Sequence, residues 1–219
     1  DETETNGRTT YLLKNRLQYR LTAADRLIGK LNLSRSDSSE GEFFDGEFVE
    51  AVVGFGHRPI DNDRWNTLFK YTYFYNLPAP EQQIADGSSA DFIQKSHVLS
   101  ADTIYELTPR WSIGGKYAMR IGELAASRED PEFFRSRARL GVVRLDWHVL
   151  RRWDVLLEGR RLDLIDAEDS RSGALVGVYR HFGEHIKLGV GYNFTDFSDD
   201  LTDLSYDSQG AFINFVGKY

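Results

Sequence analysis

Residues 11–21 read Tyr11-Leu-Leu-Lys-Asn-Arg-Leu-Gln-Tyr-Arg-Leu21, and this stretch decides the fold. Large apolar side chains fall at odd positions (Tyr11, Leu13, Leu17, Tyr19, Leu21), and polar ones fall at even positions (Lys14, Arg16, Gln18, Arg20). Successive side chains of a β-strand point to opposite faces, so a period of two residues is typical of a strand. The stretch therefore predicts a strand with one apolar face and one polar face.

The same alternation recurs along the chain and predicts an all-β protein. In residues 186–194, Ile-Lys-Leu-Gly-Val-Gly-Tyr-Asn-Phe, large apolar residues alternate with small or polar ones. No run approaches the roughly 18 consecutive apolar residues that a membrane-spanning helix needs. Extending the pattern predicts about eleven strands, at residues 9–22, 27–35, 47–57, 65–77, 94–107, 111–122, 137–149, 153–164, 173–181, 186–195 and 210–219.

The composition limits the class of protein. A chain of 219 residues suits a single all-β domain, for which roughly 200 to 250 residues is an ordinary size. The absence of cysteine excludes disulfides and thiolate metal sites. A net charge of -7 argues against nucleic acid as a partner, because phosphate binding needs a basic surface. We expect residues 1–8 to form a polar surface loop and residues 9–219 to form one β-domain.

The connections between the predicted strands alternate in length. Short links fall at residues 23–26, 58–64, 108–110, 150–152 and 182–185, and long polar links fall at 36–46, 78–91, 123–136, 166–172 and 195–209. Outer-membrane barrels have short turns on the periplasmic side and long loops outside. Three tryptophans each begin a strand after a tight turn, so we expect aromatics at the membrane interface, namely Trp65, Trp111, Trp153 and the terminal Tyr219.

Alternation alone does not say which face is inside. In a soluble ligand-binding barrel the apolar face would be the core. Strands of about ten or more residues, however, match a tilted membrane crossing, and the tryptophans lie at strand ends. The sequence therefore predicts an antiparallel up-and-down transmembrane β-barrel of about 12 strands in the bacterial outer membrane, in contact with the lipid bilayer and lipopolysaccharide. Single-chain bacterial barrels have even strand numbers, so either one strand is hidden or an upstream part of the same precursor supplies it.

The C-terminal residues carry a resemblance to a known group of proteins. Residues 211–219, Ala-Phe-Ile-Asn-Phe-Val-Gly-Lys-Tyr, resemble the last strand of Gram-negative outer-membrane proteins, although the usual final residue is Phe rather than Tyr. Together with residues 189–204, this strand resembles the C-terminal barrel of large repeat-bearing envelope proteins. The resemblance covers the last third of the chain, and the rest only by pattern. It implies an anchor or export barrel and recognition by the barrel-assembly machinery, and it carries over no catalytic residue.

The polar faces of the predicted strands would line the inside of the barrel. In a symmetric hairpin around Arg151, His148 lies opposite Asp154 and Arg144 lies opposite Glu158, so opposite charges meet. The first strand has three cations and no acid of its own. We interpret the inner charges as an ion-pair lattice that fills the barrel, with a narrow channel or translocator for a small solute or polypeptide as the alternative. The predicted inner set is Lys14, Arg16, Arg20, Lys30, Glu50, Lys70, Asp102, Glu106, Lys116, Arg120, Arg144, Asp146, His148, Asp154, Glu158, Arg160, Arg180 and Lys187.

Other candidate sites are weaker. No Ser or Cys is placed near the His148–Asp154 pair, so we predict no enzyme, no cofactor and no metal site. The acidic segment 196–207 lacks the glycine and closing glutamate of the helix-loop-helix calcium motif, and we expect it to be solvated. Arg161 falls on the apolar face near the predicted outer rim, where it is expected to contact lipopolysaccharide. The sequence therefore favours an anchor barrel over a channel or a soluble ligand-binding barrel.

Overall fold

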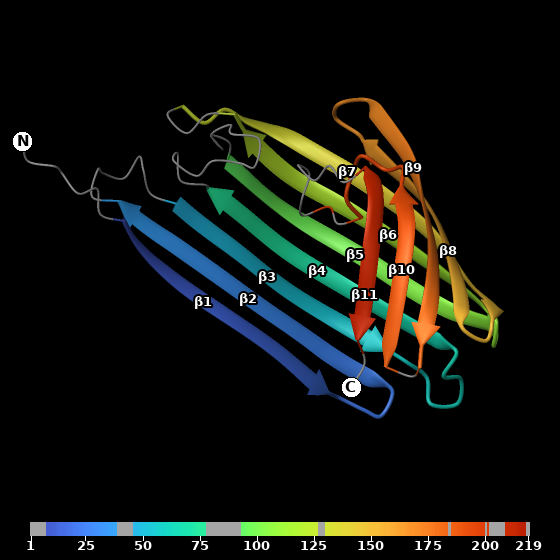
Figure 1. Ribbon diagram of the computed structural model, residues 1–219. Helices are drawn as coiled ribbons and strands as arrows, with labels where there is room; N and C mark the ends of the chain where they lie inside the picture. Colours follow the sequence, from blue (N-terminus) through green and yellow to red (C-terminus); the bar gives the residue numbers. More distant parts are fainter. Residues whose placement is uncertain are drawn as a thin grey trace, which may run out of the picture.

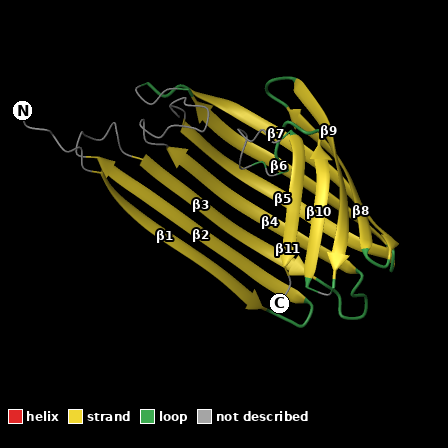
Figure 2. Ribbon diagram, viewed as in Figure 1, coloured by secondary structure: helices red, strands yellow, loops and turns green. Residues whose placement is uncertain are grey.

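A computed structural model of the chain describes residues 8–38, 46–77, 93–126, 130–183, 185–199, 201 and 209–217. They form one sheet in which every strand pairs antiparallel with its neighbours in sequence, and the sheet curves round on itself (Figure 1). Within these ranges no helix is long and apolar enough to cross a membrane. The strands are β1 (Arg8–Arg20), β2 (Asp25–Ser38), β3 (Gly46–His57), β4 (Trp65–Leu77), β5 (Ile93–Thr108), β6 (Trp111–Ala125), β7 (Phe133–Leu150), β8 (Trp153–Leu164), β9 (Asp169–Phe182), β10 (Ile186–Asn193) and β11 (Gly210–Gly217), drawn as arrows in Figure 2.

The predicted all-β, up-and-down architecture is confirmed, and one predicted loop is wrong. The long link expected at residues 166–172 is a four-residue turn, because β9 already begins at Asp169. The first residues of β9 are serines and charged residues, so the apolar pattern did not reveal this part of the strand. Asp166 closes the turn by accepting hydrogen bonds from the Arg137 main-chain N–H at 2.6 Å and from its guanidinium at 2.7 Å. These bonds hold the pKa of Asp166 below its ordinary value of 3.8.

The apolar set of side chains faces outward. Val143, Val190 and Ile213 are 61%, 55% and 79% exposed, and they share this face with other large exposed residues such as Trp147, Leu188 and Phe215. The opposite face is concave, and residues of several strands meet there. Leu17, Val190 and Phe215 are exposed on separate strands and not buried together, so the arrangement that a soluble barrel requires is absent from the described sheet.

The sheet has two edges, β1 and β11. Among the described residues these strands pair only with β2 and β10 respectively. Because eleven strands alternate in direction, β1 and β11 run the same way (Figure 1). The sheet is therefore curved but not closed, and one strand antiparallel to both edges would complete an even-numbered barrel.

Candidate functional site: the inner face of the sheet

The concave face, called the inner face below, carries the polar side chains that the alternation predicted. Glu158 and Asp154 on β8 are buried on this face, and the registers Arg144↔Glu158 and His148↔Asp154 confirm the predicted hairpin pairs. One member of the predicted set is wrong. Arg180 lies on the outer face, because it is paired with Trp153 and its guanidinium lies 5.3 Å from that indole ring.

The most buried ionic cluster centres on Glu158. Its carboxylate is fully buried and accepts hydrogen bonds from Arg144 Nε at 2.7 Å and from Arg160 Nε at 2.5 Å. The Arg160 side chain is only 8% exposed, whereas that of Arg144 is 42% exposed. Two guanidiniums thus share one buried carboxylate, and the removal of that carboxylate would leave both cations without their partner.

A second cluster lies nearer the tight turns and centres on Asp154. This largely buried carboxylate contacts His148 Nδ1, accepts a hydrogen bond from His181 Nε2 at 2.7 Å and pairs with Lys187 Nζ at 2.6 Å. The four side chains come from β7, β8, β9 and β10. The cluster therefore ties four consecutive strands together on the inner face, whereas the sequence predicted only the His148 contact.

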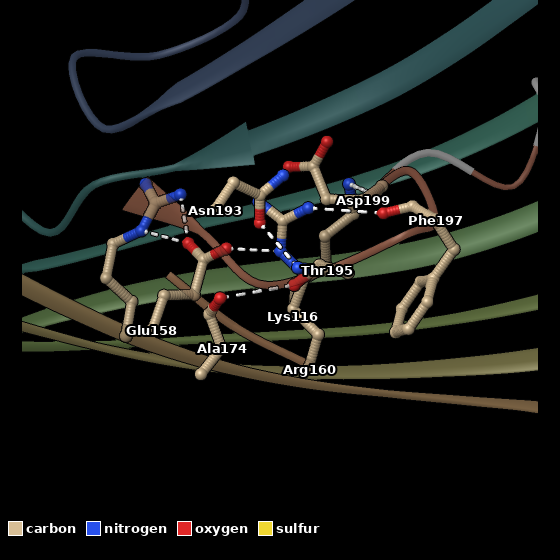
Figure 3. A network of polar contacts seen from close by, with 9 residues as sticks. Lys116, Glu158, Arg160, Ala174, Asn193, Thr195, Phe197 and Asp199 are labelled. Atoms are coloured by element: carbon tan, nitrogen blue, oxygen red, sulfur yellow. Dashed lines mark hydrogen bonds and ion pairs between the residues drawn. The ribbon is translucent and has the colours of Figure 1, made fainter. Parts of the chain in front are cut away.

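The segment that follows β10 lies against the inner face, and the sequence missed this. Arg160 and Lys116 donate hydrogen bonds to the main-chain carbonyls of Phe197 and Asp199, at 3.5 Å and 2.5 Å (Figure 3). Thr195 is fully buried and its hydroxyl donates to the Ala174 carbonyl at 3.4 Å. Charged side chains of the barrel wall thus hold the backbone of a connection that was expected to lie outside and solvated. Asp200 and residues 202–208 of the predicted acidic loop lie outside the described residues.

Two apolar side chains anchor this segment, whose described residues are 194–199 and 201 and which is called the inner segment below. Phe197 is 5% exposed and Leu201 is 2% exposed. They pack in a small apolar cluster with residues of β5, β6, β7 and β8, namely Val98, Ala118, Ala138, Leu140, Val142 and Leu162. A segment leaving β10 therefore crosses the inner face and packs against β5 to β8.

The inner face of β1 and β2 is positively charged. Arg16 lies opposite Lys30, and Arg20 lies opposite Arg26. Lys30 pairs with Glu50 on β3 at 2.7 Å, and Arg20 donates to the Thr22 carbonyl. Lys14 and Arg16 have no ion pair within the described part of the chain. Within the described residues, the first-strand cations Lys14, Arg16 and Arg20 thus have no acidic partner, whereas Lys30 of the neighbouring β2 has one.

Arg120 on β6 is a buried cation on the same face. Its side chain is fully buried between β5 and β7, and its three nitrogens, with Ser96 Oγ and Gln94 Nε2, make no hydrogen bond with the described residues. Asp102 and Glu106, two further predicted inner acids, lie on β5, and Asp102 is paired with Lys116 in the register. A buried guanidinium without a partner is costly, so this position is the least satisfied part of the wall.

Tryptophans lie together at the end of the sheet with tight turns. Trp111 stacks on Trp147 of β7 with ring centroids 4.8 Å apart and an angle of 8° between the planes. Trp65 and Trp153 begin β4 and β8 at the same end. Sequence analysis missed Trp147 because it precedes a turn rather than following one, although the hairpin register places it across from Trp111. Tyr219, also predicted for this level, lies outside the described residues.

The described inner face supports a structural role for its charges. No group of three His, Asp or Glu side chains within the described ranges is arranged to hold a metal ion. His148 is oriented by Asp154, but Lys187 and His181 already occupy the same carboxylate. The chemistry that this arrangement favours is mutual neutralisation of charge in a confined space, together with anchoring of the inner segment.

Comparison with known proteins indicates the fold and does not assign a family. No protein-family model matches the sequence, and no curated protein matches it. Among solved structures, the chain is similar to the NanC porin, with a TM-score of 0.53 and 8% sequence identity. The superposition covers 98% of this chain and 97% of the porin chain. The whole chain therefore has a porin-like arrangement of antiparallel strands.

Proposed function

We propose that the chain is an outer-membrane β-barrel that anchors a larger envelope protein and whose interior is occupied. The observation that carries this proposal is the division of side chains between the two faces. Large apolar residues are exposed along the outer face, whereas buried charges pair on the inner face. Such a molecule would expose far more apolar surface to water than soluble proteins tolerate, but it suits a bilayer.

The inner segment favours an anchor over an open channel. Phe197 and Leu201 occupy the interior, and Lys116 and Arg160 hold the segment in place through its carbonyls. A barrel of about twelve strands is intermediate between the eight-stranded barrels that side chains fill and the 16- to 18-stranded porins that hold an aqueous channel, so the inner segment decides how much room remains. A steady water-filled pathway would require this segment to move, which makes a narrow channel the second candidate.

The two open edges support a contribution from another part of the same precursor. In a bilayer, the unpaired N–H and C=O groups of β1 and β11 would each cost several kcal/mol, so an open edge cannot face lipid. One antiparallel strand between them satisfies both edges. We propose that a segment upstream of Asp1 provides this strand, which would also attach the barrel directly to the protein that it anchors.

A fusion experiment tests anchoring. With a folded reporter joined ahead of Asp1 together with the natural upstream segment, we expect reporter and barrel to fractionate together with the outer membrane of a Gram-negative host. The matched control carries Leu188→Asp and Val190→Asp on the outer face of β10, and it should fail to insert because each acid would face lipid. A reporter that remains soluble with the unaltered barrel would contradict the proposal.

The edges can be tested with cysteine pairs, since the natural chain has no cysteine. Neighbouring strands lie about 4.8 Å apart, so one intervening strand separates β1 from β11 by roughly twice that distance, beyond the reach of a disulfide. Across a panel pairing Leu13 or Leu17 of β1 with Ile213 or Phe215 of β11, we therefore expect no disulfide in the anchored protein. Ready disulfide formation would mean that β1 and β11 meet directly.

A further inference from the structure

The outer face of β5 to β8 carries a group of cations near the end opposite the tryptophans. Five basic side chains point outward there, and they face the carboxylates of Glu123, Asp163 and Asp166. The whole chain, by contrast, has a net charge of -7. This cationic surface has residues from the three strands β5, β7 and β8, and it consists of Lys95, Arg135, Arg137, Arg139 and Arg161.

Three of these cations are already engaged. Lys95 pairs with Glu123 at 2.8 Å and lies 4.2 Å from the centre of the Phe133 ring. Arg137 is held by Asp166. Arg135 lies opposite Glu123 in the register, so these three cations share two carboxylates, those of Glu123 and Asp166.

The two remaining cations, Arg139 and Arg161, lie beside a single carboxylate, that of Asp163. Arg139 is exposed and makes no hydrogen bond or ion pair with any described residue. Arg161 is 64% exposed and binds Asp163 through Nε at 3.0 Å, and its terminal nitrogens make no hydrogen bond with the described residues. The two arginines are diagonal neighbours across β7 and β8, because Arg139 pairs with Asp163 and Gly141 pairs with Arg161.

The surroundings leave space for a ligand between these arginines. At Gly141, which is the register partner of Arg161, and at Gly159, two residues before it, an added Cβ would contact nothing within 4 Å. The hydroxyl-bearing Ser170 and Ser172 of β9 lie opposite Asp163 and Arg161 and are exposed. Two guanidiniums with nearby hydroxyls beside this open space match a tetrahedral phosphate, to which arginine donates two parallel hydrogen bonds.

The distance of Arg139 and Arg161 from the tryptophan level indicates that the phosphate belongs to a lipid. Arg161 lies eight residues from Trp153, and Arg139 lies eight residues from Trp147, so both are about 27 Å along the strand from the tryptophan level. With a strand tilt of about 35 to 45°, this is a rise of roughly 19 to 22 Å, so both arginines lie a few Å inside the far border of an apolar band about 25 Å tall, within reach of that border for a long side chain. Val143 and Leu157, exposed apolar residues, lie directly below.

We infer that Arg139 and Arg161 form a binding site for the phosphate groups of a lipid in the outer leaflet, such as the phosphorylated lipid of lipopolysaccharide. The inference rests on the proposed function, since it requires this face to lie in a bilayer. It extends the single contact expected at Arg161 to a two-arginine site with a defined ligand group.

The test measures phosphorylated lipid that remains with the barrel after purification from outer membranes. Replacement of both residues, Arg139→Gln and Arg161→Gln, should lower the retained lipid roughly tenfold, because charge-assisted hydrogen bonds are lost on both sides of the phosphate. Arg139→Lys with Arg161→Lys should retain an intermediate amount. The matched control is Arg180→Gln, which removes an outward arginine at the opposite end of the barrel and should leave retention unchanged.

A second arm uses vesicles of phosphatidylcholine containing lipid A with or without its phosphates. The unaltered barrel should bind only the phosphorylated form, and an excess of inorganic phosphate should not displace it. Equal retention by the double variant, or displacement by free phosphate, would overturn the lipid site while the barrel still inserts. A chain that enters vesicles of neither composition would instead overturn the proposed function, and this inference with it.

Discussion

Replacement of Glu158 by alanine is expected to lower the free energy of unfolding by about 3 to 5 kcal/mol, among the largest effects of any single substitution in the chain. The carboxylate is fully buried between Arg144 and Arg160, and Arg160 is itself nearly buried. Without Glu158 these two cations would repel each other in a poorly solvated interior. Urea unfolding in lipid vesicles, followed by tryptophan fluorescence, would measure the change.

Two controls separate the loss of charge balance from the loss of a side chain. Glu106→Ala, at an exposed position on the same inner face, should change stability by less than about 0.5 kcal/mol. Replacing the whole triad with apolar residues, Arg144→Met, Glu158→Leu and Arg160→Met, should recover most of the stability, because no unpaired charge would remain. A Glu158→Ala barrel as stable as the unaltered one would show that Glu158 does not balance these arginines.

The second large effect that we expect is the opening of a water-filled pathway through the barrel. In planar bilayers the unaltered barrel should give no steady current, because the inner segment fills the space between its walls. Phe197→Ser together with Leu201→Ser should release the segment, since both apolar contacts with β5 to β8 are lost. We expect this variant to pass discrete, persistent current steps.

The matched control for the current measurement is Phe215→Ser, which removes an apolar side chain from the outer face of β11 and leaves the inner segment in place. It should remain closed. Steady current through the unaltered barrel would favour the channel over the closed anchor, and a closed Phe197→Ser, Leu201→Ser barrel would mean that the segment is not what fills it.

The period of two residues predicted the strands and which side chains share a face, whereas strand length and the tryptophans at strand ends assigned the apolar face to the outside. A strand with one exposed apolar face and one polar face carries a repeated signal, and the hairpin geometry then fixes opposed pairs such as His148 and Asp154. Arg180 was misplaced because a cation at a strand end can snorkel along an aromatic ring on the apolar face, here that of Trp153. The alternation of polar and apolar residues alone therefore does not show on which face a side chain at a strand end lies.

The contacts of the inner segment could not be predicted from the sequence. Residues 195–209 are rich in aspartate, which is typical of a solvated loop, and only Phe197 and Leu201 hint at burial. Their partners lie on strands far away in the sequence, and the hydrogen bonds from Lys116 and Arg160 go to backbone carbonyls, which no residue pattern reveals. The charge excess on the inner face of β1 is visible in the sequence, but its neutralising partner is not.

Spin labels at single cysteines would test most directly which face meets lipid. Labels at Val143 and Val190 on the outer face, and at Lys187 on the inner face, would be compared in a barrel reconstituted into bilayers, using oxygen as the lipid-soluble relaxant and a nickel chelate as the water-soluble one. We predict that the two outer labels respond to oxygen and are shielded from nickel, and that the inner label does not share this preference. Nickel access at Val143 and Val190 equal to that of a label in free solution would contradict the account.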